Sequence, residues 1–174
     1  PSLPVASCEI PAYLPVRAKR VGVFVNESKE TILMYADRFA LDYIQLHGNE
    51  SPDIAVPYAA TAAPYQGFSI SQSKDLATVS DYKGLCDYYL FDAKTSLYGG
   101  SGNQFDWNLL HRYSGMTPFL LSGGINYSVR PSGSFITQTA GIDINSRFET
   151  APGNKDVERI GKFLQAIRTG ETAG

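Results

Sequence analysis

The stretch YYLFDAKTSLYGGSG, residues 88–102, combines a short apolar run with a glycine-rich loop. The run is aromatic and aliphatic throughout and reaches an acid, Asp92, near its end. Continuous apolar runs of this length are typical of strands covered on both faces, as in a parallel sheet. In parallel α/β folds, the loops after the carboxyl ends of the strands carry the ligand-binding residues. We therefore interpret this stretch as a buried strand whose end faces a ligand.

The same plan repeats along the chain. Five other apolar runs are separated by spacers long enough for a crossover helix, which predicts a repeat of strands and helices. The six predicted strands are 21–25, 43–47, 67–71, 88–93, 118–123 and 140–145.

Two spacers have a helical pattern and two do not. Ser28 is a candidate N-cap for a helix over 28–40. A second helix is predicted over 155–168, where apolar residues share one face: Val157, Ile160, Phe163, Leu164 and Ile167. The spacers at 51–66 and 127–139 oppose a regular helix because they contain prolines, at Pro57, Pro64 and Pro131.

Composition limits the class of protein. The 174 residues are 43% apolar and 18% charged, which fits a single domain over residues 1–174. The net charge of −2 gives no basic field for nucleic acid or an anionic membrane, and no apolar run reaches the roughly 18 residues of a membrane span. The two cysteines, Cys8 and Cys86, lie far apart in the sequence, which argues against a disulfide scaffold and against a zinc site. This use of cysteine suits a protein of the reducing cytoplasm.

Such a repeat closes either as an open doubly wound sheet or as a (βα)₈ barrel. A doubly wound sheet gathers its ligand residues at one switch point, whereas a barrel collects them from many strand ends. Here a polar residue ends nearly every run, and no GxGxxG motif follows the first strand. We therefore predict the α/β fold class and a (βα)₈ TIM barrel, of which the sequence contains strands 3–8.

Three groups of residues are candidates for chemistry. Asp92 is placed to act as a general acid at the rim of a pocket, although an N-cap or an ion pair with Lys94 would equally explain an acid there. Gly123 and Gly124 expose backbone N–H groups suited to a phosphate, although they would also make a tight turn. Asn145, Ser146 and Arg147 follow the last strand and would complete that anion site.

Gln45 and His47 lie two residues apart on one strand, so their side chains point to the same face, with His47 nearer the strand end. A single histidine at this position is more often structural than catalytic. The sequence shows no cluster with metal-ligand spacing and no serine in a nucleophile elbow, so we predict no metal site.

Four stretches together resemble the phosphoribosylanthranilate isomerases of tryptophan biosynthesis: LDYIQLHGNES (41–51), YLFDAKTSLYGGSGNQFDW (89–107), PFLLSGGIN (118–126) and GIDINSRFETAPGNKD (141–156). The resemblance implies a cofactor-free barrel that rearranges N-(5-phosphoribosyl)anthranilate to 1-(2-carboxyphenylamino)-1-deoxyribulose 5-phosphate. It implies Asp92 as the general acid and the residues around Gly123, Gly124 and Asn145 to Arg147 as the phosphate site. Gln45 and His47 would contact the substrate, His47 near its anthranilate moiety.

The sequence also departs from that family. The K-x-C-G strand that supplies the family's cysteine base does not occur, and the lysine of the family's fifth strand is missing around 66–68. Cys8 has no strand or glycine to present it, and Cys86 precedes the strand of Asp92, which places it at the opposite end of the barrel. The expectation is a single barrel domain without the family's first strand–helix–strand portion.

Three functions therefore stay open at this stage. The first is the isomerase itself, acting on a small-molecule substrate as a monomer or homodimer in the cytoplasm. The second is a noncatalytic barrel that binds a phosphorylated ligand. The third is another phosphosugar isomerase or epimerase.

Overall fold

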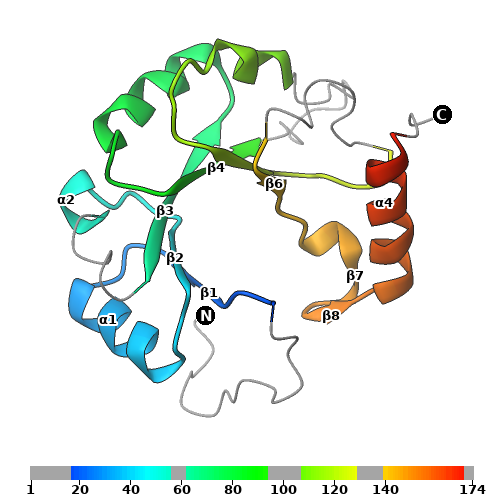
Figure 1. Ribbon diagram of the computed structural model, residues 1–174, viewed down its shortest axis with the longest axis horizontal. Helices are drawn as coiled ribbons and strands as arrows, with labels where there is room; N and C mark the ends of the chain where they lie inside the picture. Colours follow the sequence, from blue (N-terminus) through cyan, green and yellow to red (C-terminus); the bar gives the residue numbers. More distant parts are fainter. Residues whose placement is uncertain (1–16, 56–61, 94–106, 129–138, 171–174) are drawn as a thin grey trace.

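The computed structural model describes residues 17–55, 62–93, 107–128 and 139–170. A parallel sheet curls into an arc, and most helices lie on its outer side (Figure 1). In this described part of the chain, no helix has the length and apolar character needed to cross a membrane.

Six strands form the sheet, each paired in parallel with the next. They are β1 (Val21–Phe24), β2 (Tyr43–Leu46), β3 (Ala63–Ile70), β4 (Tyr88–Ala93), β5 (Phe119–Ser122) and β6 (Gly141–Ile142). All six predicted strands are present.

The order of the strands decides between the two predicted closures. Their order in the sheet is the same as their order in the sequence, from β1 to β6. A doubly wound sheet would reverse direction at a switch point, whereas a barrel adds every new strand on the same side. The curled sheet without a reversal therefore confirms the barrel class, with β1 and β6 as its two edges.

The helix α1 (Lys29–Arg38) begins as the sequence predicts. Ser28 is its N-cap, with an extended backbone and a side chain that accepts a hydrogen bond from the Thr31 N–H at 3.2 Å. Ile32 and Ala36 lie one turn apart and are buried against the sheet. The predicted spacing of apolar residues thus places one face of α1 on the core.

The last helix, α4 (Val157–Thr169), is capped by Asp156 and ends at Gly170, whose φ is 70°. Phe163 is 1% exposed and Ala166 is 2% exposed, so the buried stripe includes an alanine that the apolar pattern did not single out. Two residues of the predicted stripe are exposed instead, Val157 at 78% and Leu164 at 41%. Val157 is the first helical residue, and Leu164 is next to the buried Phe163 but turned about 100° away from it around the helix.

Three further helices lie between β2 and β5: α2 (Pro52–Ala55), η3 (Ser73–Tyr82) and η4 (Trp107–Arg112). The described residues of the spacer at 51–66 contain the single turn of α2, and β3 begins at Ala63, four residues earlier than predicted. Pro64 is therefore a strand residue near the start of β3, a position where proline is tolerated. Pro57 and the spacer residues 129–138 lie outside the described residues.

The segment after β6 differs most from the sequence prediction. The strand ends at Ile142, so the predicted strand residues 143–145 lie beyond the sheet. A short 3₁₀ turn, η5 (Ser146–Phe148), leads into a small antiparallel hairpin of β7 (Glu149–Ala151) and β8 (Asn154–Lys155). This hairpin was not predicted, because its strands are only three and two residues long and lack an alternating pattern.

The core lies between the sheet and the outer helices. Alternate strand residues point outward into it, among them Ile44, Leu46, Phe68, Ile70, Tyr89, Phe91 and Leu121, which are all at most 8% exposed. The other strand residues face the inside of the arc. There the rings of Tyr43, Tyr65 and Tyr88 meet edge to face, with ring centres 6.4 and 6.1 Å apart.

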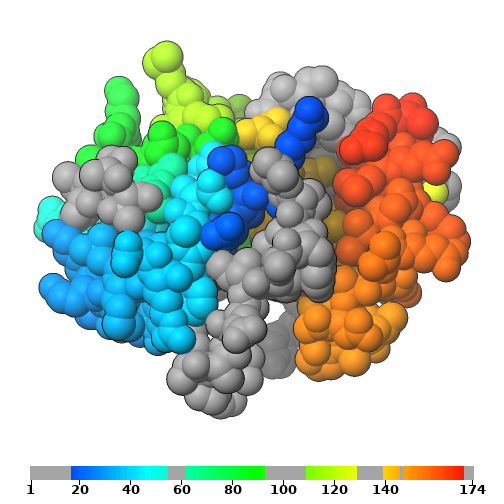
Figure 2. Space-filling view, turned by 60° about the horizontal axis from the view of Figure 1, so that its bottom comes forward, coloured from blue at the N-terminus to red at the C-terminus, as the bar shows by residue number. Residues whose placement is uncertain are grey.

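The edge strand β1 is the most exposed strand of the sheet. Val21, Val23 and Val25 are 44%, 58% and 60% exposed. Figure 2 shows atoms from the start of the described chain (dark blue) at the surface of this face. Among the described residues β1 is thus an edge strand with exposed apolar side chains, and Val25 directly follows it.

Candidate active site

A cavity of about 390 Å³ opens at the carboxyl-terminal edge of the sheet, and we call it the mouth cavity. Five of the six strands contribute to it, at or just after their ends. Its lining is Val23, Gln45, His47, Asp92, Ser122, Gly123, Gly124, Ile125, Asp143, Asn145 and Arg147. The structure thus brings together all the predicted site residues except Ser146, whose side chain is not among those described.

Asp92 and His47 face each other across this cavity. The distance from His47 Nε2 to Asp92 Oδ2 is 3.8 Å, and both side chains are about one-third exposed or less, at 32% and 27%. Asp92 pairs in register with Ser69 of β3 and Ser122 of β5, so its carboxyl group lies level with the ends of its neighbours. The alternative partner Lys94 lies outside the described residues.

The room for the His47 ring comes from the neighbouring strand. A Cβ atom at Gly67 would collide with Nδ1 of His47. Gly67 lies on the inner side of β3, between Tyr65 and Ser69, and its missing side chain leaves the space that the imidazole occupies. The glycine therefore has a packing reason and not a conformational one.

The diglycine turn follows β5 directly. Gly123 has φ 92° and Gly124 has φ 64°, a left-handed conformation that other residues rarely adopt. Both glycines line the mouth cavity, so their backbone is next to the space that a ligand would fill. The turn geometry alone accounts for the glycines, and a phosphate at their N–H groups stays a prediction.

The loop after β6 adds polar groups on the same side. Arg147 and Asn145 line the cavity, and Asn145 accepts a hydrogen bond from the Lys155 ammonium group. Lys155 also forms an ion pair of 2.7 Å with Glu149. This ion pair holds β7 against β8 and orients the amide of Asn145.

Comparisons with known proteins show the family to which the chain belongs. The family model for N-(5'-phosphoribosyl)anthranilate (PRA) isomerase matches residues 10–166. A PRA isomerase of Phocaeicola vulgatus is 47% identical over 165 residues, covering 91% of this chain and 78% of the relative. A PRA isomerase of Parabacteroides distasonis is 44% identical over 156 residues, covering 86% of this chain and 69% of the relative. This chain belongs to the PRA isomerase family.

Solved structures of PRA isomerases have the same fold. The Thermotoga maritima structure superimposes with a TM-score of 0.78 at 34% identity, covering 90% of this chain and 76% of that one. Another, at 29% identity and a TM-score of 0.75, is a complex with reduced 1-(o-carboxyphenylamino)-1-deoxyribulose 5-phosphate. The family and the barrel fold predicted from the sequence are therefore confirmed, and the chain is a member of an isomerase family.

Asp143 is the acidic residue lining the mouth cavity that sequence reasoning missed. It follows β6, lines the mouth cavity, and accepts a hydrogen bond from the Ser122 hydroxyl at 2.9 Å. The signal that singled out Asp92, an acid at the end of an apolar run, is also present in the run AGIDIN at 140–145. The sequence prediction assigned an anion site to the residues after it, Asn145 to Arg147, and gave Asp143 no role.

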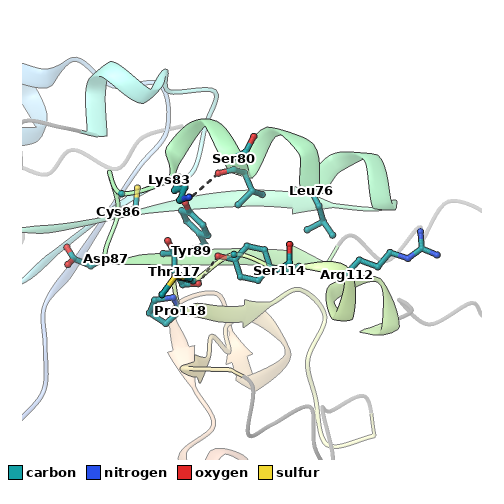
Figure 3. Close-up of a pocket in the computed structure, with 15 residues that line it drawn as sticks. Leu76, Ser80, Lys83, Cys86, Asp87, Tyr89, Arg112, Ser114, Thr117 and Pro118 are labelled. Atoms are coloured by element: carbon teal, nitrogen blue, oxygen red, sulfur yellow. Dashed lines mark hydrogen bonds between the residues drawn. The ribbon is translucent and has the colours of Figure 1, made fainter.

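A larger cavity, of about 670 Å³, lies at the other end of the sheet. Figure 3 shows it between η3 and the segments that lead into β4 and β5, with Cys86 and Tyr89 on its wall. None of the predicted site residues lines it. Cys86 is 9% exposed, and burial raises the pKa of its thiol to about 11. Its position opposite the mouth cavity and its burial confirm the sequence prediction.

Proposed function

We propose that this chain converts N-(5'-phosphoribosyl)anthranilate to 1-(2-carboxyphenylamino)-1-deoxyribulose 5-phosphate, a step of tryptophan biosynthesis, with Asp92 as the general acid. The observation that carries the proposal is the shared cavity: Asp92 faces the same space as the diglycine turn and Arg147. An acid opposite an anion site is what a phosphorylated sugar needs when its ring is opened by protonation.

The first chemical step assigned to Asp92 is a proton transfer. Its carboxylic acid gives a proton to the ring oxygen of the ribose, the bond from that oxygen to C1′ breaks, and the nitrogen lone pair forms a C=N bond. The product is an open-chain Schiff base, protonated on nitrogen, and an Asp92 carboxylate. A group that acts in this way must lie at the rim of the cavity, where the sugar ring reaches it and water is partly excluded.

The second step needs a base to remove the proton from C2′ of the Schiff base. The resulting enolamine tautomerises to the ketone. The resemblance to the family assigns this role to a cysteine of the K-x-C-G strand, which this sequence does not contain. Cys86 cannot take the role, because it lies at the opposite end of the sheet and its thiol stays protonated near neutral pH.

The substrate phosphate is assigned to the backbone of Gly123 and Gly124 and to the loop from Asn145 to Arg147. Arg147 supplies a guanidinium group, which suits a phosphate because it is planar and always charged. With the phosphate there, the anthranilate end of the substrate reaches the side of the cavity formed by Gln45 and His47. The two ends of the substrate then place its ribose at Asp92.

A second function, a noncatalytic barrel that binds a phosphorylated ligand, is favoured by one observation. The described residues that line the mouth cavity include Asp92 and the proposed anion site but no cysteine to serve as the base of the second step. A chain in this state binds the phosphorylated ligand without turning it over. The PRA isomerase family match leaves little support for a phosphosugar isomerase or epimerase of another kind.

Two measurements on the same protein separate these functions. Calorimetry with reduced 1-(o-carboxyphenylamino)-1-deoxyribulose 5-phosphate tests binding, and the loss of anthranilate-adduct fluorescence tests turnover. Turnover supports the isomerase, and binding without turnover supports the noncatalytic barrel. If the analogue does not bind at millimolar concentration, both proposals are wrong.

The partner of this site is a small molecule, and we propose the cytoplasm as its compartment. The free, buried Cys86 supports a reducing environment. A monomer or a homodimer is the proposed assembly, and one related T. maritima structure is described as monomers generated from a dimeric enzyme.

A further inference from the structure

Tyr65, Gln45 and His47 form a hydrogen-bonded chain along the inner face of the sheet. The Tyr65 hydroxyl donates to Gln45 Oε1 at 2.8 Å, and Gln45 Nε2 lies 2.9 Å from Nδ1 of His47. Tyr65 is 6% exposed and Gln45 is 7% exposed, so water does not compete for these bonds. The other ring nitrogen of His47 faces Asp92.

The direction of the first hydrogen bond is set by Tyr65. Burial, and secondarily the negative charge of Asp143, raises the pKa of the Tyr65 hydroxyl far above its usual range. The hydroxyl therefore keeps its proton and donates it to the carbonyl oxygen of Gln45. The amide NH₂ group of Gln45 is then left on the side of His47.

The second bond follows from the first. An amide nitrogen donates and does not accept, so Nδ1 of His47 must be the acceptor. In a neutral imidazole only one nitrogen carries a proton, and the proton is then on Nε2. The chain of bonds thus ends in an N–H group that points across the mouth cavity.

We propose that Tyr65 and Gln45 are positioning residues that fix His47 in the tautomer whose Nε2–H faces the Asp92 carboxyl group. The catalytic meaning of this inference rests on the proposed function of Asp92. At 3.8 Å the Nε2 to Oδ2 distance is longer than a hydrogen bond, and such contacts commonly tighten when the substrate closes the site. The N–H group then stabilises the carboxylate that Asp92 becomes after it has given its proton to the sugar.

Nitrogen-15 NMR of the imidazole rings tests the proposal on the whole chain without substrate. The sequence has two histidines, so a His111→Gln variant assigns the signals of His47. At a pH of about 9, where imidazole is ordinarily neutral, the His47 spectrum should show a proton on Nε2 and none on Nδ1. The Tyr65→Phe and Gln45→Met variants should show a mixture of the two tautomers.

Tyr43→Phe is the matched control, because it removes a hydroxyl group from the same tyrosine cluster but not from the hydrogen-bonded chain. Its His47 spectrum should equal that of the unaltered protein. A proton on Nδ1 in the unaltered protein would overturn the proposal. The proposal would also fail if the Gln45→Met variant, shown to be folded by its amide NMR spectrum, kept the His47 tautomer of the unaltered protein. The measurement needs no turnover, so failure of the isomerase assay and failure of this inference are separate results.

Discussion

Ser122 and Asp143 tie the ends of β5 and β6 together with a hydrogen bond of 2.9 Å from hydroxyl to carboxylate. The two strands share only two register pairs, Leu120 with Gly141 and Leu121 with Ile142. The side-chain bond therefore supplements a short backbone ladder at the edge of the sheet, and it also orients Asp143 in the mouth cavity.

Ser122→Ala should destabilise the protein modestly. The half-buried carboxylate loses a partner, and a bond of this kind contributes about 1 kcal/mol to the free energy of unfolding. Urea denaturation followed by circular dichroism measures the change. Ser51→Ala, at an exposed position after β2, is the control and should leave the urea concentration at the midpoint of unfolding unchanged. Equal midpoints for the two variants would mean that the Ser122 bond contributes nothing.

Asp92→Asn should keep the affinity for the product analogue but lower turnover by roughly 10²-fold or more, the scale for losing a positioned acid. The comparison is made between proteins that differ only at this residue, with the unaltered protein as the reference for turnover. Asp87→Asn, just before β4 and away from the cavity, is the control. Near-normal turnover by the Asp92→Asn variant would show that Asp92 is not the general acid and has a structural role.

Phosphate binding can be followed at single backbone amides. Inorganic phosphate should shift the amide signals of Gly123, Gly124 and Ser146, because their N–H groups are the predicted anion site. The amide of Gly84, a glycine with φ 77° near the other cavity, serves as the internal control. Shifts confined to residues remote from the mouth cavity would show that the site is misassigned.

Cys86 should alkylate slowly until the solution is strongly alkaline. Burial raises its thiol pKa from 9.0 to about 11, so the reactive thiolate is scarce in the folded protein at pH 8. In the same way, the stability that comes from burying the neutral thiol is present below pH 9 and is lost as pH rises toward 11. Iodoacetamide labelling of a Cys8→Ser variant measures the rate, with urea-unfolded protein as the reference. Equal rates at pH 8 would contradict the burial.

The exposed β1 edge predicts that the protein associates with itself. Val21 and Val23 of β1 are exposed, as is Val25 just after it, and an unpaired strand edge invites pairing with other chains. Aggregation should therefore increase with protein concentration, and Val21→Lys should reduce it, because a charge on an edge strand opposes pairing. Light scattering at matched concentrations compares the two proteins, with Met116→Lys, at an exposed position outside the sheet, as the control. Equal scattering by all three proteins would show that the β1 edge does not drive association.

The sequence predicted the parts of the fold that depend on local pattern. Ser28 was recognised as a cap because its hydroxyl group and the apolar residues behind it are local signals. The convergence of His47, Asp92 and the diglycine turn was also predictable, because parallel strands bring their carboxyl ends to one edge.

Other features depend on contacts that no local pattern reveals. Proline signals a break, yet Pro64 lies inside β3, because the sheet accepts a missing N–H group near the start of a strand. The exposure of Val157 depends on how α4 packs against the η5 segment, where Phe163 meets Phe148, and not on its own spacing. The hydrogen bond between Tyr65 and Gln45 joins residues of two strands, and only the parallel register brings them together.

The space at Gly67 has an evolutionary consequence. The imidazole of His47 occupies the volume that any larger side chain at this position would need. The two positions are therefore expected to vary together among related chains, with alanine at the position of Gly67 appearing only where the histidine has been replaced by something smaller. A glycine in the middle of a strand weakens a sheet by itself. Here it is required because the imidazole ring on the neighbouring strand needs the space.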